Sequence, residues 1–143
     1  MEFFYEGNVM WSQIDANMHL RHSAYADFAA QARLSILEYV GLNNEVFRES
    51  NVGPILFREE LIYFREIAAN HSVKIKCELT KSRIDASRWS FRHEIYRGDG
   101  IKAATVNVDG AWIDTSKRKL AVLPDFFIEF FNKIPKAADY VAE

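Results

Sequence analysis

The sequence predicts an α+β fold in which one long helix is combined with a five-stranded antiparallel sheet. The helix is expected at residues 23–40, where apolar side chains recur at helical spacing. An alternating apolar and polar segment at residues 3–11 precedes it and has the pattern of a half-buried strand, with Phe3, Tyr5, Val9 and Trp11 on its apolar face. Four further alternating segments follow the helix, at residues 55–64, 72–83, 88–97 and 101–113. This order favours a helix-and-sheet architecture over a β-sandwich, in which a single buried helix has no place.

The predicted long helix has the features of a mostly buried segment. Tyr25, Phe28 and Ile36 keep one apolar stripe, and Gly41 stands where a C-terminal capping glycine is expected. At about 1.5 Å per residue, roughly 17 residues give a length of about 25 Å. A strand of about eight residues reaches nearly the same length at about 3.3 Å per residue. One sheet therefore matches the helix from end to end, and a short terminal helix is expected after Pro124.

Length and composition indicate one globular domain spanning residues 1–143. Hydrophobic residues make up 49% of the chain, which excludes a disordered protein, and the net charge of -2 argues against nucleic acid or an anionic membrane as partner. The single cysteine, Cys77, excludes an intrachain disulfide, and its alternating surroundings predict a buried side chain. The chain shows no signal peptide and no uncharged stretch of transmembrane length, so we expect a cytoplasmic protein.

The chemistry is expected in the loop between the first strand and the long helix. Asp15, Asn17 and His19 place a carboxylate, an amide and an imidazole within five residues. The start of a helix offers unpaired N–H groups that can receive an oxyanion, while a nearby carboxylate can attack an acyl carbon or activate a water. By itself this pattern is weak, because an aspartate before a helix is more often a capping residue. His19 and His22 also have ligand-like spacing, but capping and chance explain it more readily, so no metal site is expected.

Residues 9–25 resemble the signature of the hydroxybenzoyl-CoA thioesterase-like branch of the hotdog acyl-CoA thioesterases. That signature runs Asp-x-Asp-x-x-Gly-His-x-Asn-Asn-x-x-Tyr, and Asp15, His19 and Tyr25 match its second Asp, its His and its Tyr. The similarity continues at Gly53-Pro54, at residues 92–96 and at Leu123-Pro124. The resemblance implies a hotdog fold, in which a five-stranded antiparallel sheet is wrapped around one long central helix and a short C-terminal helix follows.

The resemblance also implies an activity, hydrolysis of an acyl- or aryl-CoA, and roles for individual residues. Asp15 would act as nucleophile or general base, and the backbone N–H near His22 would polarise the thioester carbonyl. Asn17 and His19 would shape the catalytic loop. No metal or bound cofactor would be needed, since CoA arrives with the substrate, and the protein would form a homodimer or homotetramer.

Two further residues are candidates for contact with the substrate. Tyr25 is a core residue or a substrate contact, and Arg88 is the candidate for the CoA phosphates, which relatives bind through basic residues near this strand. The sequence departs from the family signature at three places: Gln13 replaces the first Asp, Met18 the Gly, and Arg21-His22 the Asn pair. These departures affect the substrate pocket and the shape of the loop more than the chemistry. The loop shape is affected at Met18, because Met adopts a positive φ less easily than Gly.

Two other functions remain open on the sequence. A hotdog enoyl-CoA hydratase carries Asp-x-Asn-Pro-x-His; Asp15 and Asn17 fit, but Met18 replaces the proline and His19 comes one residue early. The third hypothesis is a non-catalytic acyl-CoA-binding module, against which the intact Asp15 argues.

Overall fold

The computed structural model describes residues 2–143, and the chain divides into two compact units. The first unit comprises residues 2–35, 60–77 and 93–106, and the second comprises Ile36–Glu59, Glu78–Arg92 and Asn107–Glu143. Each long strand contributes one part to each unit, so the units are described separately below. That the chain is one domain stays a prediction.

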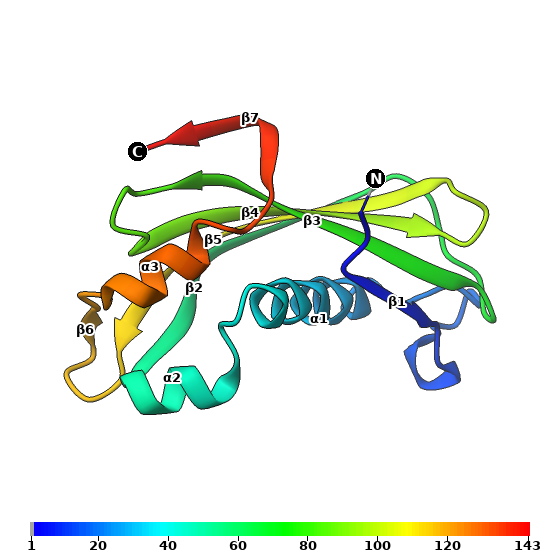
Figure 1. Cartoon of the computed structure of the whole chain (residues 1–143). Helices are drawn as coiled ribbons and strands as arrows, with labels where there is room; N and C mark the ends of the chain where they lie inside the picture. The colour runs from blue at the N-terminus through cyan, green and yellow to red at the C-terminus, as the bar shows by residue number, and fades with distance from the viewer. Residues whose placement is uncertain (1) are drawn as a thin grey trace. The chain divides into compact units, whose positions relative to one another are not determined.

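The helices and strands follow one another in the order that Figure 1 labels. They are β1 (Tyr5–Asn8), a 3-10 turn η1 (Trp11–Gln13), α1 (Ala24–Tyr39), α2 (Asn44–Ser50), β2 (Val52–Tyr63), β3 (Ser72–Ser82), β4 (Arg88–Arg97), β5 (Lys102–Asp114), β6 (Lys119–Leu120), α3 (Asp125–Phe131) and β7 (Lys136–Ala142). The strand order along the sheet is β1-β3-β4-β5-β2, with β6 paired to β5 and β7 paired to β3.

The predicted helices and the four strands after the long helix are confirmed, with ends within a few residues of those expected. The five-strand path is also confirmed, but the sheet of the described residues has seven strands because β6 and β7 add to it. β7 runs parallel to β3, so the added strand breaks the antiparallel pattern. Its sequence, Lys136–Ala142, lacks the clear alternation of a strand, and its pairing with β3 determines its conformation. Helix α2 was also not predicted from the sequence.

The first unit has its core between the early turns of α1 and the strand segments of the unit. Phe28 and Ala32 of α1 are buried, as are Ile75 and Cys77 of β3. The predicted burial of Cys77 is therefore confirmed. The expected strand at residues 3–11 is shorter than predicted, and Trp11 does not share a buried face with Val9. The chain turns at η1, and Trp11 is 85% exposed.

The second unit has an aromatic core. Trp112 packs edge-on against Phe127 with ring centroids 5.0 Å apart, and Trp89 lies 5.8 Å from Trp112. Gly110 allows this packing, since a Cβ there would clash with the carbonyl oxygen of Ile55 and with the ring of Trp89. In Figure 1 the C-terminal strand β7 lies alongside β3, as the pairing of residues 79–82 with residues 136–142 requires.

Candidate active site

A tight turn in the first unit holds Asp15 in front of α1. Ile14 and Leu20 form an isolated antiparallel β-bridge; two backbone hydrogen bonds close the turn between them, and a third ties Leu20 to Ile67. The Asp15 N–H donates to the His19 carbonyl at 2.8 Å, the Met18 N–H donates to the Asp15 carbonyl at 3.0 Å, and the Leu20 N–H donates to Ile67 at 2.7 Å. The backbone on both sides of Asp15 is therefore fixed although its side chain is exposed.

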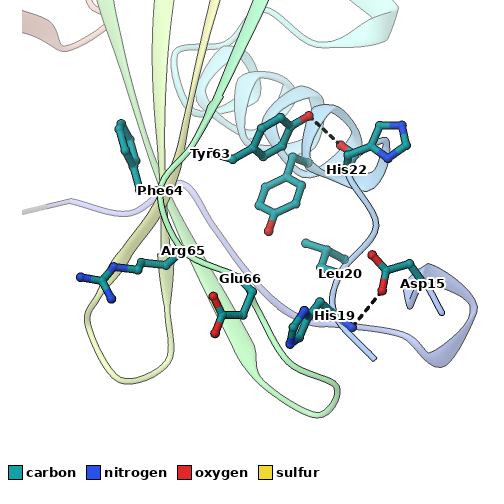
Figure 2. Close-up of a pocket in the computed structure, with 9 residues that line it drawn as sticks. Asp15, His19, Leu20, His22, Tyr63, Phe64, Arg65 and Glu66 are labelled. Carbon is teal, nitrogen blue, oxygen red and sulfur yellow. Dashed lines mark hydrogen bonds between the residues drawn. The ribbon is translucent and has the colours of Figure 1, made fainter. Parts of the chain in front are cut away.

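The Asp15 carboxylate is oriented by the turn itself. Its Oδ1 accepts hydrogen bonds from the backbone N–H of Asn17 at 2.9 Å and of His19 at 3.2 Å. No described residue bonds to Oδ2, so this oxygen is available to a substrate or a water. Figure 2 shows the carboxylate facing Leu20, with the bond to His19 on one of its two oxygens.

The three departures from the family signature have structural counterparts. Met18 has φ 65°, the left-handed conformation that Gly adopts most easily, so the loop keeps the glycine geometry without the glycine. Gln13 accepts a hydrogen bond from the Met10 N–H at 2.8 Å through its side chain and closes η1. Arg21 donates to the Ser12 carbonyl at 2.6 Å and to the Ser23 hydroxyl at 3.0 Å, which ties η1 to the start of α1.

A hollow of about 330 Å³ opens beside Asp15. We call it the Asp15 hollow; its lining residues are Asp15, His19, Leu20, His22, Tyr25, Tyr63, Phe64, Arg65 and Glu66. Figure 2 shows that they come from the loop and the start of α1 on one side and from the end of β2 and the segment after it on the other. The Tyr63 hydroxyl donates to the His22 carbonyl at 3.1 Å and links the two sides.

Tyr25 places a phenol at the hollow. It is buried, and its ring meets that of Tyr63 edge-on with centroids 5.1 Å apart. Burial raises the pKa of the Tyr25 hydroxyl, and Tyr63, Asp15 and Glu66 raise it further. The hydroxyl therefore stays protonated at neutral pH and can act as a hydrogen-bond donor.

The start of α1 offers backbone donors. The Ala24 N–H donates to the Arg21 carbonyl at 3.0 Å. Within residues 2–143 the N–H groups of His22 and Ser23 donate to no protein atom. Such groups carry partial positive charge at a helix start and are suited to an anionic oxygen.

No sequence motif indicates the lining residues that the segment at and after the end of β2 contributes. Arg65 and Glu66 belong to no motif, and only the fold brings them to the loop. The pKa of the Glu66 carboxyl lies below its ordinary value because of a backbone hydrogen bond and the nearby charges of His19, Arg97 and Arg65. The Asp15 hollow thus contains a second carboxylate, which is ionised at neutral pH.

The structure brings four of the six predicted site residues to one hollow: Asp15, His19, His22 and Tyr25. Asn17 is exposed, and it contributes its backbone N–H to Asp15 rather than a side chain to the hollow.

Arg88 is absent from the lining of the Asp15 hollow. It lies in the second unit, where its guanidinium stacks 5.2 Å from the ring centroid of Phe57. It lines another hollow, of about 220 Å³, that also includes Lys81, Asp109 and Glu143.

Two further properties of the described residues bear on function. Within residues 2–143, no group of three or more His, Cys, Asp or Glu side chains is arranged to hold a metal ion. None of the helices in this part of the chain combines the length and apolar character needed to cross a membrane.

Comparison with known proteins places the chain among thioesterases. Residues 9–131 match the sequence profile of the thioesterase-like superfamily. No curated protein matches the sequence.

Several solved structures have the same fold. A hypothetical protein from Staphylococcus aureus, solved in complex with CoA, has a TM-score of 0.83 at 17% identity, covering 92% of this chain and 82% of its own. The DHNA-CoA thioesterase of Staphylococcus aureus has a TM-score of 0.80 at 20% identity, covering 90% and 85%. A 1,4-dihydroxy-2-naphthoyl-CoA thioesterase from Synechocystis has a TM-score of 0.79 at 17% identity, covering 92% and 96%. These likenesses confirm the expected hotdog fold.

Proposed function

This chain belongs to the thioesterase-like superfamily, and from that premise we propose that it hydrolyses the thioester of an acyl- or aryl-CoA to the free acid and CoA. The observation that carries the proposal is the placement of Asp15. One carboxylate oxygen is held by two backbone N–H groups, and the other is available at a hollow that opens at the start of a helix. Solved structures of the same fold include a complex with CoA and enzymes named for aryl-CoA substrates.

In the proposed reaction Asp15 acts on the carbonyl carbon of the thioester. As general base, its Oδ2 takes a proton from a water while the water oxygen bonds to that carbon. The N–H groups of His22 and Ser23 receive the oxyanion that forms on the carbonyl oxygen. When the tetrahedral intermediate collapses, the C–S bond breaks, and the CoA thiolate leaves and takes up a proton. The neutral Tyr25 hydroxyl supplies a further hydrogen bond to the substrate.

Asp15 could instead attack the carbon directly and form a mixed anhydride with the acyl group, which water then cleaves. The two routes differ in the source of the new oxygen in the acid. In a single turnover in ¹⁸O-labelled water, an unlabelled acid with label in Asp15 identifies the anhydride route. The general-base route labels the product in the first turnover, whereas attack of water on the Asp15 carbonyl of the anhydride leaves an enzyme oxygen in the product.

Asp15→Asn tests the proposed function. The amide can neither attack nor accept a proton, so kcat should fall on the order of 10²-fold or more. The variant keeps an oxygen that can accept the hydrogen bonds of Asn17 and His19, so its thermal unfolding should resemble that of the wild type. Thiol release from a panel of acyl- and aryl-CoAs measures activity, and wild-type kcat in the folded variant would refute the mechanism.

The two alternative functions give different results in the same panel. A hydratase would add water to a crotonyl-type substrate without releasing thiol. A binding module would bind CoA and release nothing. We favour hydrolysis because the same hollow is lined by Asp15, which has one oxygen without a protein hydrogen bond, and by His22 at the start of the helix.

We further propose that the protein is a homodimer joined along β2, or a homotetramer made of two such dimers. β2 ends the strand order of the sheet, so one of its edges has no neighbouring strand among the described residues. The strand is 12 residues long and exposes several large apolar side chains: Leu56, Phe57, Ile62 and Tyr63. A long apolar edge strand is a site at which another strand pairs.

The remaining proposals concern cofactors and compartment. Hydrolysis by Asp15 needs no metal or bound cofactor, so dialysis against EDTA should leave kcat unchanged. We propose the cytoplasm as the compartment, which fractionation of cells carrying the tagged protein would test.

A further inference from the structure

Asp15 lines two hollows of the first unit. Besides the Asp15 hollow, it lines a second one of about 320 Å³, together with Trp11, Ser12, Ile14 and Met18. We call this second space the Trp11 hollow. Both volumes fall at the lower end of the range for small-molecule sites, about 300–1,000 Å³.

The two hollows differ in chemistry. The Asp15 hollow includes His19, Arg65 and Glu66 and therefore has several polar and charged walls. Among the described residues that line the Trp11 hollow, Asp15 is the only charged one, and the others are apolar except for Ser12. Asp15 thus lines both a polar space and an apolar space.

The apolar side chains of the Trp11 hollow are not part of the core. Trp11 is 85% exposed and Met18 is 58% exposed. An exposed Trp forgoes the burial that normally stabilises this side chain, by about 25 cal/mol for each Å² of apolar surface. These two large apolar side chains beside the candidate catalytic residue therefore contribute little to the stability of the folded chain.

The backbone of Met18 gives a second, independent reason to assign a function to this hollow. Its φ of 65° is left-handed, a conformation that costs a residue with a side chain about 1 kcal/mol or more. Glycine would adopt this conformation without that cost. This strained residue places a thioether side chain in the lining of the Trp11 hollow.

We infer that the Trp11 hollow binds the acyl group of the substrate and selects for apolar or aromatic acyl groups, with Trp11 and Met18 as specificity-determining residues. This inference rests on the proposed function. The carbonyl carbon of a thioester joins two parts of the substrate: the alkyl or aryl arm of the acyl group and the pantetheine arm linked through sulfur. A catalytic residue that acts on this carbon therefore lies near both arms. The apolar hollow suits an alkyl or aryl arm, and the polar Asp15 hollow suits the amide-bearing pantetheine arm.

The alternative occupant of the Trp11 hollow is another copy of the chain. The apolar acyl group is favoured because the hollow shares Asp15 with the candidate catalytic site. Sedimentation of the variants described next decides between the two.

The experiment compares kcat/KM for hexanoyl-CoA and benzoyl-CoA with that for acetyl-CoA. In Trp11→Ala and in Met18→Gly the preference for the large acyl groups should fall about tenfold, because contact with the apolar wall is lost. Met18→Gly should also keep a melting temperature no lower than that of the wild type, since it relieves the left-handed strain. The matched control is Met10→Ala, which removes a neighbouring side chain that is 60% exposed and does not line the hollow. It should leave the preference unchanged.

Each outcome is decisive. An unchanged preference in both folded variants, or an equal change in the Met10→Ala control, overturns the inference. A shift of Trp11→Ala or Met18→Gly to a smaller oligomer without a change in preference overturns it in favour of a subunit contact. If the wild type releases thiol from none of the substrates, the proposed function fails, a result distinct from an active enzyme without acyl preference.

Discussion

His93 gives the protein a stability that should depend on pH in a predictable way. Its side chain is fully buried in the first unit. Nδ1 lies 2.8 Å from the Val106 carbonyl, to which it donates, and Nε2 lies 3.1 Å from the Arg33 guanidinium, from which it accepts. Burial, and then the positive charge of Arg33, lower the pKa of His93 from 6.5 to about 3.

The sign of the effect follows from proton binding. Below pH 6.5 the unfolded chain binds a proton at His93, whereas the folded protein does not until about pH 3. The unfolded state therefore binds more protons in this window, and the free energy of unfolding falls as the pH falls. At about 1.4 kcal/mol for each pH unit, acidification to about pH 4.5 removes about 3 kcal/mol through this residue.

Urea unfolding of the wild type and of His93→Gln at pH 7.5 and 4.5 measures this contribution. Glutamine offers an amide N–H donor and an acceptor oxygen but does not titrate. Carboxyls with lowered pKa, such as Asp99 beside Arg97, also reduce stability in acid, but they do so equally in both proteins. The wild type should therefore lose about 3 kcal/mol more than the variant between the two pH values. Equal losses would show that His93 is not held neutral, and would refute the argument.

Three other predictions follow from particular contacts. If Arg88 binds the CoA phosphates, as the family resemblance implies, Arg88→Ala should raise KM for acyl-CoA several-fold with kcat nearly unchanged and should hardly affect an acyl-pantetheine thioester; equal weakening of both substrates would make Arg88 structural. Gly110→Ala should lower the free energy of unfolding by about 1–3 kcal/mol in urea titrations, since its methyl group would clash with Ile55 and Trp89. Sedimentation should show at least a dimer at micromolar concentration, and a β2 variant such as Ile62→Lys should favour the monomer; a wild-type monomer would contradict joining along β2.

The Asp15 loop shows how far a local motif reaches. Its signature placed a carboxylate before a helix, because the spacing of Asp15, His19 and Tyr25 is a property of a short continuous segment. It did not disclose that Asn17 acts through its backbone, nor that Met18 adopts a left-handed conformation. Those features depend on how the turn closes on itself in space.

The sequence alone determined the main helix and the strands of the five-strand path, because each has an apolar period that repeats within the element itself. Tertiary structure decided the features that have no such local pattern. The pairing of β7 with β3 depends on residues more than 50 positions apart, and Arg65 and Glu66 reach the Asp15 hollow only because β2 ends beside the loop. Trp11 was expected to be buried by alternation, but the hydrogen bond from the Met10 N–H to Gln13 turns the chain first. Local periodicity indicates which side of a helix or strand is apolar. Contacts between residues distant in sequence decide whether another segment covers that side or whether it stays exposed, as Trp11 does beside Asp15.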